Sequence, residues 1–206
     1  MNEQLSEALR RIQVTYDNQL SALHLTGLEL DHLPELLLKA SHLRVLGLKS
    51  NLLKDLPKDI HRMKQLRVLE LEDNQLSILP DGIGTFADLR VFVLKNNLLT
   101  HLPESMGQLN SLRMLELRDN ALTDLPESLF SLPNLRELYL HGNQLTRLPD
   151  LRRLPKLAKL DLSGNPLTEL PAGLEALPGL RMLWVDEALV EKVPASLRPL
   201  LQASAL

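Results

Sequence analysis

The sequence contains no cysteine. Disulfide-capped ends, thiolate zinc sites and a cysteine nucleophile are therefore excluded. The sequence also lacks any Asn-x-Ser/Thr acceptor for glycosylation, although asparagine recurs along the chain. From both absences we expect a protein of the reducing cytoplasm.

Aromatic residues, long apolar runs and excess positive charge are also scarce. Only 3% of the residues are aromatic, and the formal net charge is −3. No apolar run approaches the length of a membrane span, and the first residues lack the charged-then-apolar order of a secretory signal. We therefore expect no membrane partner. Because the chain lacks the dense positive charge that neutralises phosphates, we also expect no nucleic-acid partner.

Leucine, in contrast, recurs at a fixed interval. Eight segments read LxxLxLxxNxLxxLP, and they begin 23 residues apart except for one step of 22. Self-similarity at this period indicates a solenoid, in which each segment is one unit stacked on the next. The segments begin at Leu20, Leu43, Leu66, Leu89, Leu112, Leu135, Leu157 and Leu180.

Each segment combines a strand pattern with a turn pattern. Leu69 and Leu71 alternate with outward residues, a period of two that predicts a short strand. Since every coil places this strand at the same height, we expect a parallel sheet. Proline follows the last core position of every segment, a leucine in all but the last, and predicts a short helix or 3-10 turn on the opposite side. The segment after Pro149 is one residue shorter and predicts a tighter coil.

One asparagine per coil is expected to satisfy buried backbone groups, because an amide side chain both donates and accepts hydrogen bonds. The two terminal segments place Leu28 and Ala188 there instead. The predicted ladder consists of Asn51, Asn74, Asn97, Asn120, Asn143 and Asn165.

This pattern resembles the intracellular leucine-rich repeat class with LPxxIxxL convex segments, as in Scribble-like, Ras-suppressor-like and plant Ras-group-related proteins and many bacterial ones. The resemblance covers roughly Leu20 to Leu200. It implies an α/β solenoid, a right-handed superhelix shaped like a horseshoe with a concave parallel sheet. We expect a single domain with a helical cap over 1–19, repeats over 20–194 and a second cap over 195–206.

The expected N-terminal helix has Ala8, Ile12 and Tyr16 on one face. We interpret this helix as a cap on the first coil, with a partner-binding or membrane-surface helix as the alternative. Met1 directly before the helix and a closing segment at Leu206 favour a complete small protein.

No catalytic motif survives inspection, so we expect no enzyme and no cofactor. Gly82, Gly84 and Ala87 imitate a dinucleotide fingerprint, but they follow a proline and not a strand. The histidines fall in different coils or layers and form no metal set. Glu70 and Glu116 are predicted to face outward roughly 9 to 10 Å apart, yet an open sheet offers nothing to raise the pKa of either carboxyl.

The outward strand positions instead suggest a binding surface. One column is apolar over five successive coils, and Tyr139 and Trp184 project from the sheet. Tyr and Trp often dominate binding energy, although Trp184 could equally shield the last coil. The predicted partner-binding residues are Val45, Val68, Glu70, Val91, Val93, Met114, Glu116, Arg118, Glu137, Tyr139, His141, Lys159, Asp161 and Trp184.

A separate column of arginine follows the first leucine of six segments. We expect a structural role for it, through pairing with neighbouring carboxylates or backbone carbonyls. The whole pattern favours a monomeric, non-catalytic scaffold that binds a protein or peptide partner. The resemblance implies small GTPases, kinases or phosphatases as possible partners. The alternative is a regulatory or targeting module of a signalling enzyme or of a secreted bacterial effector.

Overall fold

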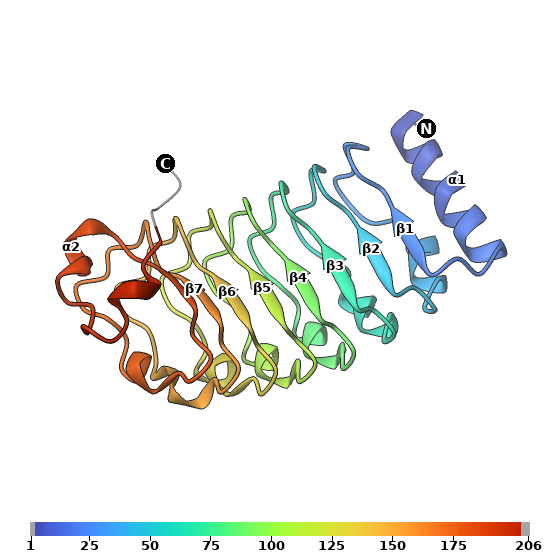
Figure 1. Ribbon diagram of the computed structural model, residues 1–206. Coiled ribbons are helices and arrows are strands. Elements are labelled where there is room, and N and C mark those ends of the chain that lie inside the picture. Colours follow the sequence, from blue (N-terminus) through green and yellow to red (C-terminus); the bar gives the residue numbers. More distant parts are fainter. Residues whose placement is uncertain (1–2, 203–206) are drawn as a thin grey trace.

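Each leucine-rich segment forms one coil, with a three-residue strand on one side and a short helix on the other (Figure 1). The computed structural model describes residues 3–202. Within that range the strands form one sheet in sequence order, and every neighbouring pair is parallel. The predicted horseshoe solenoid is thereby confirmed. The strands are β1 Ala22–His24, β2 Val45–Gly47, β3 Val68–Glu70, β4 Val91–Val93, β5 Met114–Glu116, β6 Glu137–Tyr139, β7 Lys159–Asp161 and β8 Met182–Trp184.

Short 3-10 helices line the convex side of the coils. In the first five coils a proline immediately precedes the helix, as the sequence predicts. The shorter segment after Pro149 contains a three-residue helix that begins after Asp150. The helices are η1 Glu35–Lys39, η2 Lys58–Arg62, η3 Asp81–Thr85, η4 Glu104–Gln108, η5 Glu127–Ser131, η6 Leu151–Arg153, η7 Leu174–Ala176 and η8 Arg198–Leu200.

A continuous apolar core runs between the sheet and the convex helices. The inward strand residues, such as Leu69 and Leu71, are fully buried. The asparagine ladder lies at the edge of this core and is confirmed. Asn97 donates to the carbonyls of Leu71 and Leu94 at 2.9 and 3.0 Å, and its Oδ1 accepts the Leu76 N–H at 3.0 Å. One side chain therefore ties adjacent coils together.

The N-terminal helix α1, Glu3–Asp17, packs beside the first coil (Figure 1). It buries Ala8, Ile12 and Thr15. Tyr16, which the helical spacing assigns to the buried face, is instead 38% exposed. The difference arises because the first coil receives the helix on a face centred between Ala8 and Thr15.

The C-terminal end of the stack carries helix α2, Glu187–Val190, and then η8. Leu201 returns to the sheet and forms an isolated parallel bridge with Leu183 of β8. Residues 1–2 and 203–206 of the two expected caps lie outside the described residues.

Candidate functional site

The outward positions of the strands form two straight columns across the concave face. Register pairs Val45 with Val68, Val68 with Val91 and Val91 with Met114. These four side chains are half-buried and form an apolar band over β2 to β5. Twelve of the fourteen predicted site residues lie within strands, and Arg118 and His141 lie two residues after the ends of β5 and β6. The fold therefore brings the predicted residues onto one face.

Tyr139 lies at the centre of a preformed cluster beyond the apolar band. The Arg118 guanidinium carbon lies 5.1 Å from the centroid of the tyrosine ring. The centroid of the Trp184 ring, from β8, lies 6.4 Å from that of Tyr139, and the two rings are tilted by 54°. Asp161 pairs with both residues in the sheet and is buried between them. The tyrosine ring therefore contacts both a cation and a second aromatic ring.

Hydrogen bonds fix the polar groups of this cluster. The Tyr139 hydroxyl donates to Glu137 Oε2 at 2.8 Å. Burial, together with this carboxylate, raises the pKa of Tyr139 well above its usual value. The bond to Glu116 raises the pKa of Arg118. Tyr139 therefore stays neutral and Arg118 stays charged at physiological pH.

Glu116 differs from its expected position. The sequence places Glu70 and Glu116 outward on an open, solvated sheet, but Glu116 is buried at 6% exposure. Its carboxylate accepts two bonds from the Arg118 guanidinium, at 2.5 and 2.8 Å. Burial is tolerated because the charge is neutralised by a bidentate partner. A carboxylate held in this way is not free to act as an acid or base toward a substrate.

A second polar network, which the sequence does not reveal, joins His141, Ser163 and Asp161. The Ser163 hydroxyl donates to Asp161 Oδ1 at 2.6 Å, and His141 Nδ1 lies 2.9 Å from the same hydroxyl. The serine is buried. The aspartate accepts from the serine hydroxyl and therefore orients the serine, whereas it does not orient the histidine ring. A nucleophile would need the reverse order, with the histidine between the two. The sequence shows only that His141 and Ser163 occupy the same outward place in neighbouring segments, and it does not show the hydrogen bond between them.

Charges at the carboxyl ends of the strands neutralise one another. Lys49 lies 3.6 Å from Glu72 and 3.8 Å from Asp73, and Lys95 lies 3.8 Å from Asp119. Asp73 and Asp119 occupy left-handed turns at φ 57° and 56°, a conformation in which Asp is enriched. These aspartates occupy the turns and pair with lysines, so they add little net charge to the concave face.

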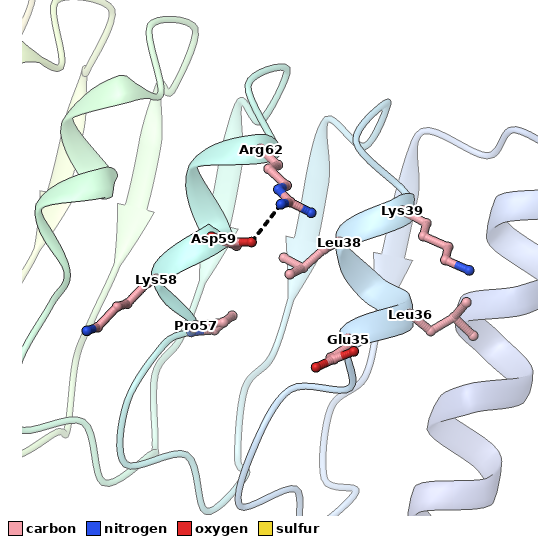
Figure 2. Close-up of a pocket in the computed structure, with 8 residues that line it drawn as sticks. All are labelled: Glu35, Leu36, Leu38, Lys39, Pro57, Lys58, Asp59 and Arg62. Carbon is pink, nitrogen blue, oxygen red and sulfur yellow. Dashed lines mark ion pairs between the residues drawn. The ribbon is translucent and has the colours of Figure 1, made fainter.

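A hollow of about 550 Å³ lies on the convex side between η1 and η2 (Figure 2). Its charged groups do not converge on a common point. Asp59 and Arg62 pair with each other at 2.8 Å, while Lys39 and Lys58 point away in opposite directions. Such divergence gives no site for chemistry.

The described residues also lack a cluster of metal ligands and a membrane-spanning helix. Within residues 3–202, no group of three or more His, Cys, Asp or Glu is placed to hold a metal ion. Over the same range, no helix combines the length and apolar character needed to cross a bilayer.

A stacked coil with one strand, one asparagine and one convex helix defines a leucine-rich repeat protein. Family models agree. Models described as leucine rich repeat match residues 78–122 and 115–167, and a second such model matches residues 65–86. The chain belongs to the leucine-rich repeat family. A search of curated protein sequences found no significant match.

Solved structures similar to this chain come from plants and bacteria. One is the ectodomain of the Arabidopsis thaliana receptor kinase GASSHO1/SCHENGEN3 in complex with CASPARIAN STRIP INTEGRITY FACTOR 2. It is 34% identical, with a TM-score of 0.66, and the match covers 74% of this chain and 19% of that one. Another is YopM, a leucine-rich effector protein from Yersinia pestis. It is 31% identical, with a TM-score of 0.74, and the match covers 89% and 47% of the two chains.

An internalin from Listeria monocytogenes has the same fold, with a TM-score of 0.75 at 17% identity and coverage of 89% and 56%. The matched part of each of these three structures is less than two thirds of its length. Together, the family and these relatives support a protein-interaction module.

Proposed function

We propose that this protein binds a protein or peptide partner on its concave face, without catalysing a reaction. The observation that carries the proposal is the Tyr139 cluster, in which Arg118 and Trp184 flank the ring beside the apolar band. Tyr, Trp and Arg are the residue types most enriched at binding hot spots. Their combination with half-buried valines matches the mixed apolar and polar character of a protein interface.

Rigidity supports the same proposal. The Tyr139 hydroxyl and the Arg118 guanidinium each have a hydrogen-bond partner before any ligand arrives. Side chains that are already ordered lose little entropy on binding, so more of the contact energy contributes to affinity. The complex of the GASSHO1/SCHENGEN3 ectodomain with CASPARIAN STRIP INTEGRITY FACTOR 2 supports binding by a structure of this fold.

The test is a double substitution, Tyr139→Ala with Val91→Glu. Removing an anchor of this kind costs about 2 kcal/mol or more of binding free energy, roughly 30-fold in affinity. Partner capture from the native lysate, followed by mass spectrometry, should therefore be lost while the protein stays folded. A matched control reverses two exposed convex charges, Glu104→Lys with Glu127→Lys. If the control loses the partner and the concave variant keeps it, the partner binds the convex side and the proposal is wrong.

A second candidate is a regulatory or targeting module within a larger protein. It is supported by the match to a receptor kinase ectodomain and to a bacterial effector, each longer than this chain. Sequencing the full reading frame distinguishes the two candidates directly. A kinase or GTPase domain in the same frame would favour the module.

We further propose that the protein acts in the cytoplasm as a monomer. A chain without cysteine needs no oxidising compartment to fold. Fractionation of the native cell tests the compartment, and light scattering coupled to gel filtration tests the monomer. Recovery from the culture medium would contradict the cytoplasmic location, and a dimeric mass would contradict the monomer.

A further inference from the structure

The amino ends of the strands carry a row of arginines. One arginine immediately precedes each of β2 to β6 and β8, and together they are called the arginine edge here: Arg44, Arg67, Arg90, Arg113, Arg136 and Arg181. The sequence suggests that these side chains pair with carboxylates or carbonyls. That expectation is wrong, because none of the six guanidinium groups makes an ion pair or hydrogen bond within residues 3–202.

The backbone holds these arginines at close spacing. The N–H of Arg67 donates to the carbonyl of Arg44 at 2.8 Å, and the N–H groups of Arg90 and Arg113 repeat the bond to the preceding arginine. Adjacent members from Arg44 to Arg136 therefore lie about 4.8 Å apart at the backbone. Like charges on neighbouring strands repel, and no ion pair among the described residues offsets the repulsion. Asp88, the acid nearest to Arg90 in the sequence, forms no ion pair with any residue of the range 3–202.

The opposite edge of the same sheet shows that this is not a general property of the fold. At the carboxyl ends, Lys49, Lys95 and Arg118 each lie within 4 Å of an acid. The chain has a formal net charge of −3, yet it leaves unneutralised cations along one edge. Such a separation of charge favours an anionic partner on that edge alone.

The row is interrupted at one coil, and the interruption opens a hollow. Ala158 occupies the arginine place before β7, and a hollow of about 470 Å³ surrounds it. Arg136 and Arg181 line it from the two neighbouring coils, together with Lys156 and Lys159. Lys159 is paired with Glu137 at 3.2 Å, and Lys156 donates to Asn134 Oδ1 at 2.6 Å. Within residues 3–202, Lys156, Arg136 and Arg181 have no acid partner, so their charges remain for an anionic ligand. No acidic residue lines this hollow.

We propose that the arginine edge docks an acidic, extended peptide segment of the protein partner, with one of its carboxylates in the hollow at Ala158. The inference rests on the proposed function, since it names the chemistry of the same partner. The apolar band of Val45, Val68, Val91 and Met114 adjoins the edge residue by residue. A peptide that carries both acidic and apolar side chains can contact both columns, whereas a polysaccharide or nucleic acid can contact only the charges.

Geometry sets the length of the segment. From β2 to β8 the edge spans six strand spacings, or about 29 Å, which an extended peptide covers with about nine residues. The probe is therefore a fluorescein-labelled peptide of about nine residues that alternates glutamate and valine. Matched probes carry glutamine or lysine in place of glutamate, and heparin serves as a polyanion without apolar groups.

The protein variant is Arg90→Glu with Arg113→Glu, and its matched control is Lys54→Glu with Arg147→Glu. Both control residues are exposed, lie in irregular segments beyond the carboxyl ends of the strands and make no ion pair within residues 3–202. Fluorescence polarisation should show binding of the glutamate probe only. We expect the edge variant to weaken it about tenfold or more, and the control to leave it unchanged. Raising salt to about 1 M, where the Debye length is about 3 Å, should also weaken it.

The hollow has its own test. Ala158→Glu places a carboxylate among the cations and should abolish probe binding, whereas Ala158→Gln is similar in size but neutral and should retain more of it. Equal effects of the two variants would show that the hollow does not bind a carboxylate of the peptide. Binding of heparin without binding of the glutamate probe would overturn the peptide assignment.

Capture of the native partner separates this inference from the proposed function. Loss of the partner in Tyr139→Ala with Val91→Glu, but not in the edge variant, would leave the concave site intact and refute the arginine edge. Loss in the edge variant alone would support the edge and refute the Tyr139 centre.

Discussion

The guanidinium of Arg118 covers the ring of Tyr139 while it binds the carboxylate of Glu116. One side chain thus performs two tasks, neutralising a buried acid and positioning an aromatic ring. A cation over an aromatic face contributes about 0.5 to 1 kcal/mol at a partly exposed site. The binding surface and the stability of the sheet are therefore linked at this residue.

The first prediction concerns that link. Arg118→Gln leaves Glu116 buried without its charged partner and should lower the free energy of unfolding by about 1 to 3 kcal/mol. Replacing both residues, as Glu116→Gln with Arg118→Gln, should cost less than the sum of the two single changes, because the uncompensated charge is gone. Urea unfolding of the four proteins gives the coupling. Strict additivity would mean that the pair contributes nothing.

The second prediction uses the one tryptophan as a reporter. Trp184 is partly exposed at the concave face, 6.4 Å from Tyr139. A partner that covers this face should remove water from the indole and shift its emission to shorter wavelength. The measurement is a fluorescence titration with a tryptophan-free partner fragment. An unchanged spectrum at saturation would place the partner away from β6 to β8.

The third prediction tests the asparagine ladder. Asn97→Ala removes the acceptor of the Leu76 N–H and the donor to Leu71 and Leu94. Each buried group left unsatisfied costs about 1 to 3 kcal/mol, so stability should fall by at least that amount. Gln75→Ala, at an exposed position, is the control and should change stability by less than about 0.5 kcal/mol. Similar urea midpoints for the two variants would rule out a structural ladder.

The fourth prediction compares two glycines. A Cβ at Gly107 would lie 2.4 Å from Ser128 Cβ and 2.8 Å from its backbone carbonyl, between helices η4 and η5. A Cβ at Gly47 would meet the His24 ring at 2.5 Å, and that side chain is exposed and can rotate. Gly107→Ala should therefore destabilise by about 1 to 3 kcal/mol, and Gly47→Ala by clearly less. Thermal unfolding of both variants shows which substitution lowers the stability more.

The fifth prediction is a pH dependence of the N-terminal helix. Hydrogen bonds from Arg10 and Arg11 lower the pKa of Glu7 from 4.5 to about 2. Because the folded pKa lies below the unfolded one, the stabilisation is complete above about pH 4.5 and is lost as pH falls toward 2. Exposure to solvent keeps the effect small. Glu7→Gln should lower the melting temperature slightly at pH 7 and not at pH 2, and high salt should shrink the difference. A difference that persists at pH 2 would exclude the carboxylate as its cause.

Side-chain partners across the sheet were harder to predict than the backbone. The outward alternation correctly placed Tyr139 and Trp184 in one column, but it gave no sign that their rings meet over the buried Asp161. The same pattern put Glu116 in solvent, where the structure buries it under Arg118. Contacts of this kind depend on rotamers and on residues from different coils, which no single repeat encodes.

The sequence by itself determined the coil, the register and the ladder. Leucine, asparagine and proline recur at fixed places, and each acts locally or on the next coil, so translation along the stack repeats the same hydrogen bonds and the same burial. The tertiary structure alone decided which charges are neutralised. Lys95 reaches Asp119 across one strand spacing, while the arginines before the strands form no ion pair with any described acid. Whether a surface charge finds a partner depends on side-chain reach between columns, and only the assembled sheet sets that distance.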